Sequence, residues 1–435
     1  MKLKTLALVC AGAASASMFS SSVLAATEVN FWYSGGTKPQ QMMTKLIEEF
    51  NASQDEYVVK PALQGNYTET YQKLQAGLAS KTAPELVLLD SGRAEAMHGR
   101  GLSRDLTAFM DEEFNFSDFI GAFKDQVTAD DGTIIGLPAY GTTQVFYYNK
   151  QVLADNGFTE QDLNTWQGVA KVAEKVTQRD EKGKVTFYGW EPMWGQDNMI
   201  DAAFSNGAKI ISDDGKKVLI DSPEWVEVWD SFRQWIHDDQ IMRIHYGGQG
   251  WEYWYKTIDD VMKDNALGYT GSSGDQGDLD FTKLAATTQP GWGGHPSAPQ
   301  AGALVYVMPK GTDDAAAKGA FEFVEFYTNA KNTAAWSMFT GYIPVRNSVS
   351  EVPEYQAFTQ DNPQALIPLK QANTATKDFL DPTNGKIMDA LKVAADQIQI
   401  QNVPAEKALK QAAKRRNVLW IERIVHNVGF KTARI

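Results

Sequence analysis

The chemistry open to this chain is limited by the reactive residues that it lacks. Its five histidines do not show the spacing of metal ligands on one helical turn, and no G-x-S-x-G elbow or P-loop lysine is present. The single cysteine, Cys10, lies in an apolar N-terminal segment. A secreted carbohydrate hydrolase needs only two carboxylates that face each other across a cleft, so with 54 acidic residues this alternative stays open. Because nothing marks out such a pair, the sequence favours a binding protein over an enzyme.

Small and polar residues follow three predicted strands near the N-terminus. The strands cover residues 29–33, 57–61 and 85–90, and they alternate with helices predicted over 39–51 and 71–80. Such alternation predicts parallel pairing in an α/β sheet, where ligands lie beyond the carboxyl ends of the strands. The positions selected in this way are Ser34-Gly35-Gly36, Gly65-Asn66-Tyr67 and Asp90-Ser91-Gly92.

The aromatic content suits a sugar ligand. Sugars present apolar C–H faces and hydroxyl edges, so a sugar site needs flat rings together with Asp, Asn, Ser or Thr. The chain has 12 Trp, 16 Tyr and 21 Phe. Composition alone does not separate rings in a cleft from rings in the core.

Several tryptophans fall on predicted helices. Those near one face of the helix predicted over 223–237 are expected in the core. They are Trp225, Trp229 and Trp235, and the pattern continues on the next helix with Trp251, Trp254 and Tyr255. Trp190 and Trp194 lie in a segment interrupted by Gly and Pro, where the sequence favours a cleft position but leaves a core position open.

The first 25 residues have the features of a cleaved secretion signal. Lys2 and Lys4 precede an apolar stretch that is too short to span a membrane, and small residues at 23–26 fit signal-peptidase cleavage. Cleavage would change the formal net charge from -13 to -15, because two lysines and no acidic residue are lost. An acidic protein without a basic stripe is not expected to bind nucleic acid. The remaining 410 residues are more than a single hydrophobic core usually serves, so we expect two lobes.

A series of short motifs occurs along the chain in one order. Each motif is weak by itself, but together they extend over nearly the whole mature chain. They are Gly65-Asn66-Tyr67-Thr68-Glu69-Thr70, Asp131-Gly132, Gly136-Leu137-Pro138, Tyr147-Tyr148-Asn149-Lys150, Thr165-Trp166, Ser272-Ser273-Gly274 and Thr340-Gly341-Tyr342-Ile343-Pro344-Val345. The order of these motifs resembles that of bacterial extracellular solute-binding proteins, which serve ABC importers. Within this family the chain resembles the carbohydrate-uptake branch, and within that branch it is most similar to glycerol-3-phosphate-binding proteins.

This resemblance implies an α/β fold of two lobes, the type II periplasmic-binding-protein fold, with three hinge crossings and a ligand cleft between the lobes. The crossings would lie near residues 138–145, 297–303 and 342–347. The first lobe would comprise 26–140 and 300–344, and the second lobe 141–299 and 345–435, after a signal peptide over 1–25. The implied function is capture of a sugar, oligosaccharide or polyol phosphate in the periplasm, by a monomer that delivers it to a membrane permease.

The resemblance also implies cleft residues. Tyr67 and Asp90 match positions that contact ligand hydroxyls, and Asp90 could also be a helix N-cap. Thr142 or Thr143 matches a crossover serine. The remaining matches are Ser272 and Ser273 as donors to the polar end of the ligand, Trp190 or Trp194 as a wall, Gly302 through its backbone amide, and Tyr342 beside the last hinge crossing.

One departure from the family bears on the ligand. Glycerol-3-phosphate binders carry an arginine in the last helical segment, where a guanidinium can pair with phosphate through two hydrogen bonds. Here that position aligns near Met388, and the nearest cation is Lys386, which would act as a point charge. We therefore expect a neutral sugar to bind more tightly than glycerol-3-phosphate, with a specific glycerol-3-phosphate binder as the alternative.

The C-terminal segment from Lys414 to Ile435 is basic for such an acidic chain. We expect a helix extension or a disordered tail, and a contact with the membrane or permease is the remaining alternative.

Overall fold

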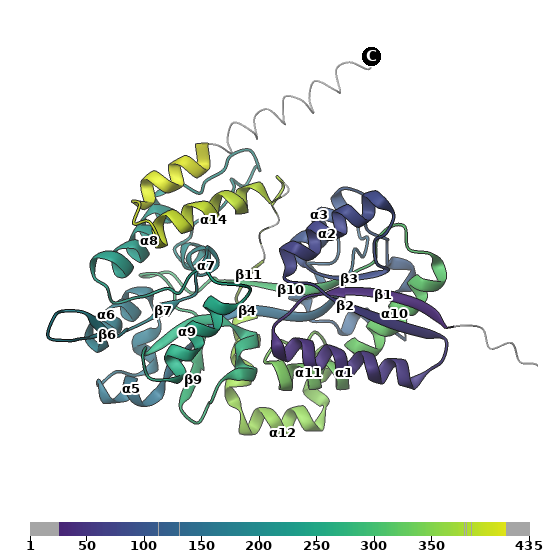
Figure 1. Ribbon diagram of the computed structural model, residues 1–435, viewed down its shortest axis with the longest axis horizontal. Helices are drawn as coiled ribbons and strands as arrows, with labels where there is room; N and C mark the ends of the chain where they lie inside the picture. Colours follow the sequence, from purple (N-terminus) through teal and green to yellow (C-terminus); the bar gives the residue numbers. More distant parts are fainter. Residues whose placement is uncertain are drawn as a thin grey trace, which may run out of the picture.

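The computed structural model describes residues 26–414, apart from residues 112, 130, 378, 380 and 384 (Figure 1). The predicted signal peptide and the basic tail after Lys414 lie outside this part of the chain. The strands are β1 (Thr27–Tyr33), β2 (Tyr57–Leu63), β3 (Leu86–Asp90), β4 (Leu137–Asn149), β5 (Gln178–Arg179), β6 (Val185–Phe187), β7 (Glu191–Pro192), β8 (Gly268–Ser272), β9 (Leu284–Thr287), β10 (Gln300–Val307) and β11 (Thr376–Lys377).

Helices cover the sheet and make up much of the rest of the described chain. They are α1 (Thr37–Ser53), α2 (Tyr67–Ser80), α3 (Ser91–Gly99), α4 (Gly121–Lys124), α5 (Lys150–Asp155), α6 (Trp166–Val176), α7 (Asp197–Ser205), α8 (Pro223–Arg233), α9 (Glu252–Met262), α10 (Asp314–Thr328), α11 (Ala330–Thr340), α12 (Pro353–Asp361), α13 (Ile367–Ala372) and α14 (Lys386–Gln399). None of the helices within the described residues is long and apolar enough to cross a membrane.

Within the described residues, nine strands form one mixed sheet in the order β2-β1-β3-β10-β4-β8-β7, with β11 beside β10 and β9 beside β4. The expected parallel pairing is confirmed for β1 with β2 and with β3. The middle of the sheet differs, because β10 is antiparallel to both β3 and β4. The reason is that β4 carries the chain away from the first group of strands while β10 brings it back, so the two must run in opposite directions.

Strand β4 joins the two halves of the molecule (Figure 1). Its first part, 137–143, pairs with β10, and its second part, 144–149, pairs with β8 and β9. Almost all of its side chains are buried, which explains why the sequence here is a long apolar and aromatic run with little alternation.

Apolar side chains gather in separate cores at the two ends of this sheet. The first core draws its residues mainly from 29–140 and 301–345, whereas the second draws them from 146–292 and 387–413. A small cluster attaches Val349 and Tyr355 to Ala334 of α11. The lobe boundaries expected from the sequence stay a prediction, and this last contact favours moving residues 347–361 to the first lobe.

Helix starts and faces follow the local sequence. Asn66 caps α2 by accepting from the Glu69 amide at 2.9 Å, as its place before the helix predicts. On α8 the expectation of core tryptophans is confirmed, because Trp225 and Trp229 have no exposed surface. The helix continues into a short π-helical turn, Gln234–Asp238, in which Trp235 is also buried.

Candidate ligand-binding cleft

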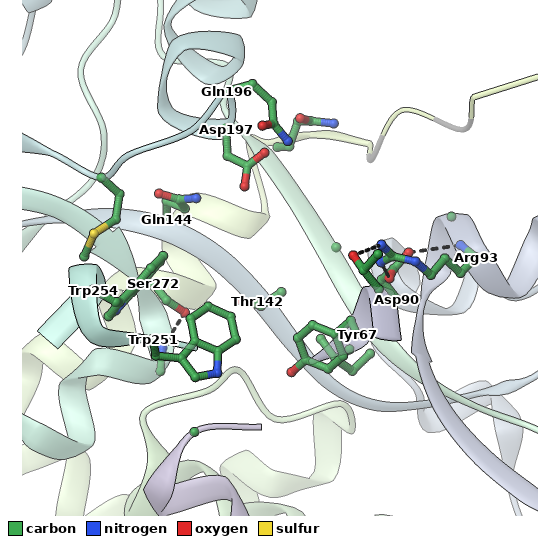
Figure 2. A pocket seen from close by; sticks show the side chains of 18 of the residues that line it. Tyr67, Asp90, Arg93, Thr142, Gln144, Gln196, Asp197, Trp251, Trp254 and Ser272 are labelled. Atoms are coloured by element: carbon green, nitrogen blue, oxygen red, sulfur yellow. Dashed lines mark hydrogen bonds and ion pairs between the residues drawn. The ribbon is translucent and has the colours of Figure 1, made fainter. Parts of the chain in front are cut away.

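A cleft of about 920 Å³ lies between the two cores and is lined by residues from both (Figure 2). The crossing strands form its floor. Thr142 and Gln144 come from β4, and Gly302 comes from β10. Gln144 accepts a hydrogen bond from the side chain of Asn198, which orients its amide in the cleft. The floor therefore offers hydroxyl, amide and backbone groups to a ligand.

The wall on the side of the first core combines a ring with an ion pair. The Tyr67 hydroxyl lies 3.2 Å from the Tyr140 hydroxyl, and burial raises the pKa of Tyr67, so it stays a neutral phenol. Asp90 caps α3 by accepting from the Arg93 amide at 3.0 Å, and it also pairs with the Arg93 guanidinium. Arg93 donates a further bond to Thr68 Oγ1 at 2.9 Å. Asp90 thus acts as the N-cap of α3 and also lines the cleft.

The opposite wall begins directly after β7. Trp194 donates from Nε1 to Asp396 at 2.8 Å and meets the ring of Tyr253 edge-on, with centroids 5.0 Å apart. Asp197 follows in the first turn of α7, and its side chain remains accessible from the open cleft (Figure 2). The surrounding protein removes part of its hydration and raises its pKa, although Lys392 opposes this effect. This wall presents an indole and a carboxylate to the cleft.

The N-terminal end of α9 supplies the aromatic surface of the cleft. Trp251 and Trp254 pack edge-to-face with centroids 5.8 Å apart, and both line the cleft (Figure 2). Tyr255 is a further lining residue. Trp254 is held by a hydrogen bond from Nε1 to Asp275 at 2.8 Å. Because Asp275 is buried, its pKa is raised to about 8.

Sequence reasoning placed the rings of α9 on a continued core pattern and so missed them as cleft residues. The feature that could have indicated their position is the run Gly247-Gly248-Gln249-Gly250 directly before Trp251. All three glycines have positive φ. Such a turn breaks the preceding chain direction and lets the start of α9 face the cleft. The sequence analysis also missed Arg93, Gln144 and Asp197. The sequence around a single polar residue does not show whether its side chain faces bulk solvent or a cleft.

Most of the residues predicted from the sequence line the cleft. They are Tyr67, Asp90, Thr142, Thr143, Trp194, Ser272, Gly302 and Tyr342. Tyr342 packs on the Tyr140 ring with centroids 4.6 Å apart. It also fills the space above Gly274, where an added Cβ would lie 2.3 Å from Cζ of Tyr342.

Three predicted residues lie elsewhere. Trp190 has no exposed surface, donates to Thr270 Oγ1 at 3.0 Å and packs on Phe146, so of the two alternatives only Trp194 faces the cleft. Ser273 is also fully buried. Lys386 is exposed at the start of α14 and is not among the lining residues, although Met388, two residues further on, is. The position where the family's arginine was expected is therefore occupied by an apolar side chain at the cleft.

The charges that line the cleft are mostly negative. Seven aspartates line it, and Arg93 is the one cation among the described lining residues. Asp201 and Asp381 are engaged in the fold, the first with Gln289 and Gln300 and the second at the start of α14. Lys392 and Lys38 lie near enough to influence Asp197 and Asp278 but do not line the cleft.

Comparison with known proteins agrees with this geometry. A family model described as bacterial extracellular solute-binding protein matches residues 45–365. The chain belongs to this family.

Curated relatives extend over most of this solute-binding protein. It is 26% identical over 388 residues to the sn-glycerol-3-phosphate-binding periplasmic protein UgpB of Agrobacterium fabrum (strain C58), covering 85% of this chain and 86% of that one. It is 28% identical over 380 residues to the UgpB of Yersinia enterocolitica, covering 81% and 82% of the two chains.

Solved structures show the same two-lobed α/β fold, which is that of type II periplasmic binding proteins. UgpB from Mycobacterium tuberculosis in complex with glycerophosphocholine aligns with a TM-score of 0.78 and 18% identity, covering 92% of this chain and all of that one. Maltose-bound MalE3 of T. maritima aligns with a TM-score of 0.78 and 19% identity, covering 91% of this chain and all of that one.

Proposed function

We propose that this solute-binding protein captures a neutral sugar, oligosaccharide or polyol in the periplasm and delivers it to the permease of an ABC importer. The observation that carries the proposal is the lining of the cleft. Trp194, Trp251 and Trp254 offer flat faces for C–H surfaces, while Thr142 and Gln144 offer polar groups for hydroxyl edges. A volume of about 920 Å³ suits a ligand of one to several sugar rings.

The charge of the cleft favours a neutral ligand over a phosphate. Asp197, Asp278 and Asp389 line the cleft and would repel an anion. Arg93 is already neutralised by Asp90, so a phosphate would have to compete with a carboxylate for the guanidinium. Met388 supplies no charge at the position where the resemblance places the phosphate-pairing arginine.

Glycerol-3-phosphate remains the second candidate. Two observations favour it: the curated relatives are named for this ligand, and Arg93 does reach the cleft wall. In that case Arg93 would leave Asp90 and pair with the phosphate, a charge-assisted contact about twice as strong as a neutral hydrogen bond.

We further propose that ligand binding closes the two lobes about the crossing segments. Support comes from the two cores, which are joined by β4 and β10, and from a bridge between Gly141 and Ile343 that brings the third expected crossing beside the first. Closure would bring Tyr67 and Trp254 toward each other across the ligand. A permease could then distinguish the liganded, closed form from the open form.

Isothermal calorimetry tests the ligand class. Neutral mono- and oligosaccharides, polyols and glycerol-3-phosphate are titrated into the same protein preparation, and the ligand is recovered afterwards for chromatography. We expect saturable one-to-one binding of a neutral ligand, weaker binding of glycerol-3-phosphate, and unchanged ligand. Cleavage products would point to the hydrolase alternative, and tighter binding of glycerol-3-phosphate than of every neutral compound would refute the proposal.

A further inference from the structure

A compact cluster of charged side chains lies on β7, on α9 and on the chain between these two elements. Glu191 on β7 and Asp260 on α9 both pair with Arg243, and His245 Nε2 lies 2.6 Å from Asp260 Oδ2. Two carboxylates thus share one guanidinium. When both carboxylates are ionised and His245 is neutral, the cluster carries one unbalanced negative charge.

One oxygen of this cluster has no hydrogen-bond donor. Glu191 is fully buried, and its Oε1 accepts from Arg243 Nε at 2.8 Å, but its Oε2 accepts from no group. An unsatisfied buried carboxylate oxygen is costly. Burial accordingly raises the pKa of Glu191 to about 8 in spite of Arg243. His245 Nε2 lies 3.8 Å from this oxygen, and the Asp260 carboxylate also lies close enough to raise the pKa of Glu191.

We propose that Glu191, His245 and Asp260 bind a divalent transition-metal ion of the Zn²⁺ class. Each residue can offer one ligand atom, and these atoms lie within 4.8 Å of one another. Bonds of about 2.0–2.2 Å to a tetrahedral Zn²⁺ place neighbouring donors about 3.4 Å apart. The observed separations of 3.8 Å and 2.6 Å lie on either side of this value. One imidazole and two carboxylates form a donor set that Zn²⁺ accepts, and the fourth position would be left to water.

Arg243 contacts both carboxylates, so a bound ion would share Asp260 with it. Arg243 donates to Glu191 Oε1 at 2.8 Å and also to Asp260 Oδ2, which leaves Glu191 Oε2 without a donor, and its guanidinium packs on the Tyr188 ring at 4.3 Å. In this position it would act as an outer hydrogen-bond donor to the carboxylate ligands, as is common around bound metals. Asn265 plays the same part for Asp260, donating to Oδ1 at 3.1 Å.

The loop that carries His245 can make the small adjustment that coordination needs. His245 is 24% exposed, and Gly247, Gly248 and Gly250 follow it with positive φ. The same loop ends at Trp251, and Asp260 lies on the helix that carries Trp254. A bound ion would therefore tie β7, this loop and α9 together. The site is independent of which ligand the cleft takes.

The test is a calorimetric titration of Zn²⁺ into protein freed of metal with EDTA and dialysed, with no sugar present. We expect one-to-one binding that is weakened at least about 100-fold in His245→Ala, because even outer-shell changes cost 10–100-fold. His295→Ala is the matched control, since His295 is exposed and outside the cluster, and it should bind as the unchanged protein does. Zn²⁺ should also raise the melting temperature of the unchanged protein and of His295→Ala, but not that of His245→Ala.

Glu191→Gln and Asp260→Asn serve as second variants, with circular dichroism to verify folding. Each should also weaken Zn²⁺ binding. Absence of Zn²⁺ binding, or equal binding by the unchanged protein and His245→Ala, would overturn the proposal. A melting temperature that responds to pH but not to Zn²⁺ would instead identify the cluster as a proton site, which also overturns it.

Discussion

Arg93 is paired with Asp90, the residue that caps the helix on which Arg93 lies. The pair stands in the cleft wall, so the one cation among the described lining residues is neutralised before any ligand arrives. An anionic ligand must therefore compete with the Asp90 carboxylate for the Arg93 guanidinium.

Asp90→Asn should release the guanidinium without removing the helix cap, because Asn caps as well as Asp. We expect affinity for glycerol-3-phosphate to rise about tenfold or more, since a hydrogen bond to a charged group is worth roughly 1.5–3 kcal/mol. Affinity for a neutral sugar should fall or stay unchanged. Calorimetry with both ligands measures the switch. Asp278→Asn is the control, because it removes the same charge elsewhere in the cleft; an equal gain in this variant would mean that only net charge matters.

Trp251→Ala should weaken sugar binding by about 1–2 kcal/mol through the loss of a ring face against the ligand. Trp251 is preferable to Trp254, whose indole holds the buried Asp275. Titration of the sugar found in the ligand panel gives the affinity. Tyr246→Ala, a neighbouring ring that is 58% exposed and outside the cleft lining, should bind normally. If both variants bind like the unchanged protein, the α9 surface does not contact the ligand.

Asp275→Asn should remove part of the pH dependence of the free energy of unfolding. Asp275 has a pKa of about 8 in the folded protein against 3.8 for a free carboxyl, so between these values the folded state holds a proton that the unfolded state has lost. The free energy of unfolding therefore falls as pH rises, by at most about 1.4 kcal/mol per pH unit for this group. Asparagine does not titrate, so the variant should gain stability relative to the unchanged protein between pH 5 and pH 7.5. Urea unfolding at both pH values measures the difference, and a constant difference would show that Asp275 is ionised throughout.

Ligand binding should reduce the radius of gyration in solution scattering. The reduction follows from closure of the two cores about the crossing strands, and it should disappear for Trp251→Ala at ligand concentrations too low to saturate it. An unchanged radius at saturating sugar, with binding confirmed by calorimetry, would describe a rigid lectin-like protein.

Local sequence patterns were sufficient to predict helices and strands and some of the residues that line the cleft. The apolar runs and capping residues indicated strands and helices, including α1 over Thr37–Ser53 and the buried face of α8. Tyr67 and Asp90 were found because they follow strands, and ligand sites of open α/β sheets lie beyond strand ends. Rules of this kind depend only on residues close together in the chain.

Tertiary structure decided what the sequence left open. Trp190 and Trp194 occupy equivalent sequence surroundings, but the first packs on Phe146 in the core and the second opens onto the cleft. The α9 rings were expected in the core and instead line the cleft. Periodicity shows that a face is apolar, but only the packing of distant segments determines whether another element or a ligand covers it. For the same reason, Glu191, His245 and Asp260, separated by up to 69 positions, become one cluster only when β7 and α9 are brought together.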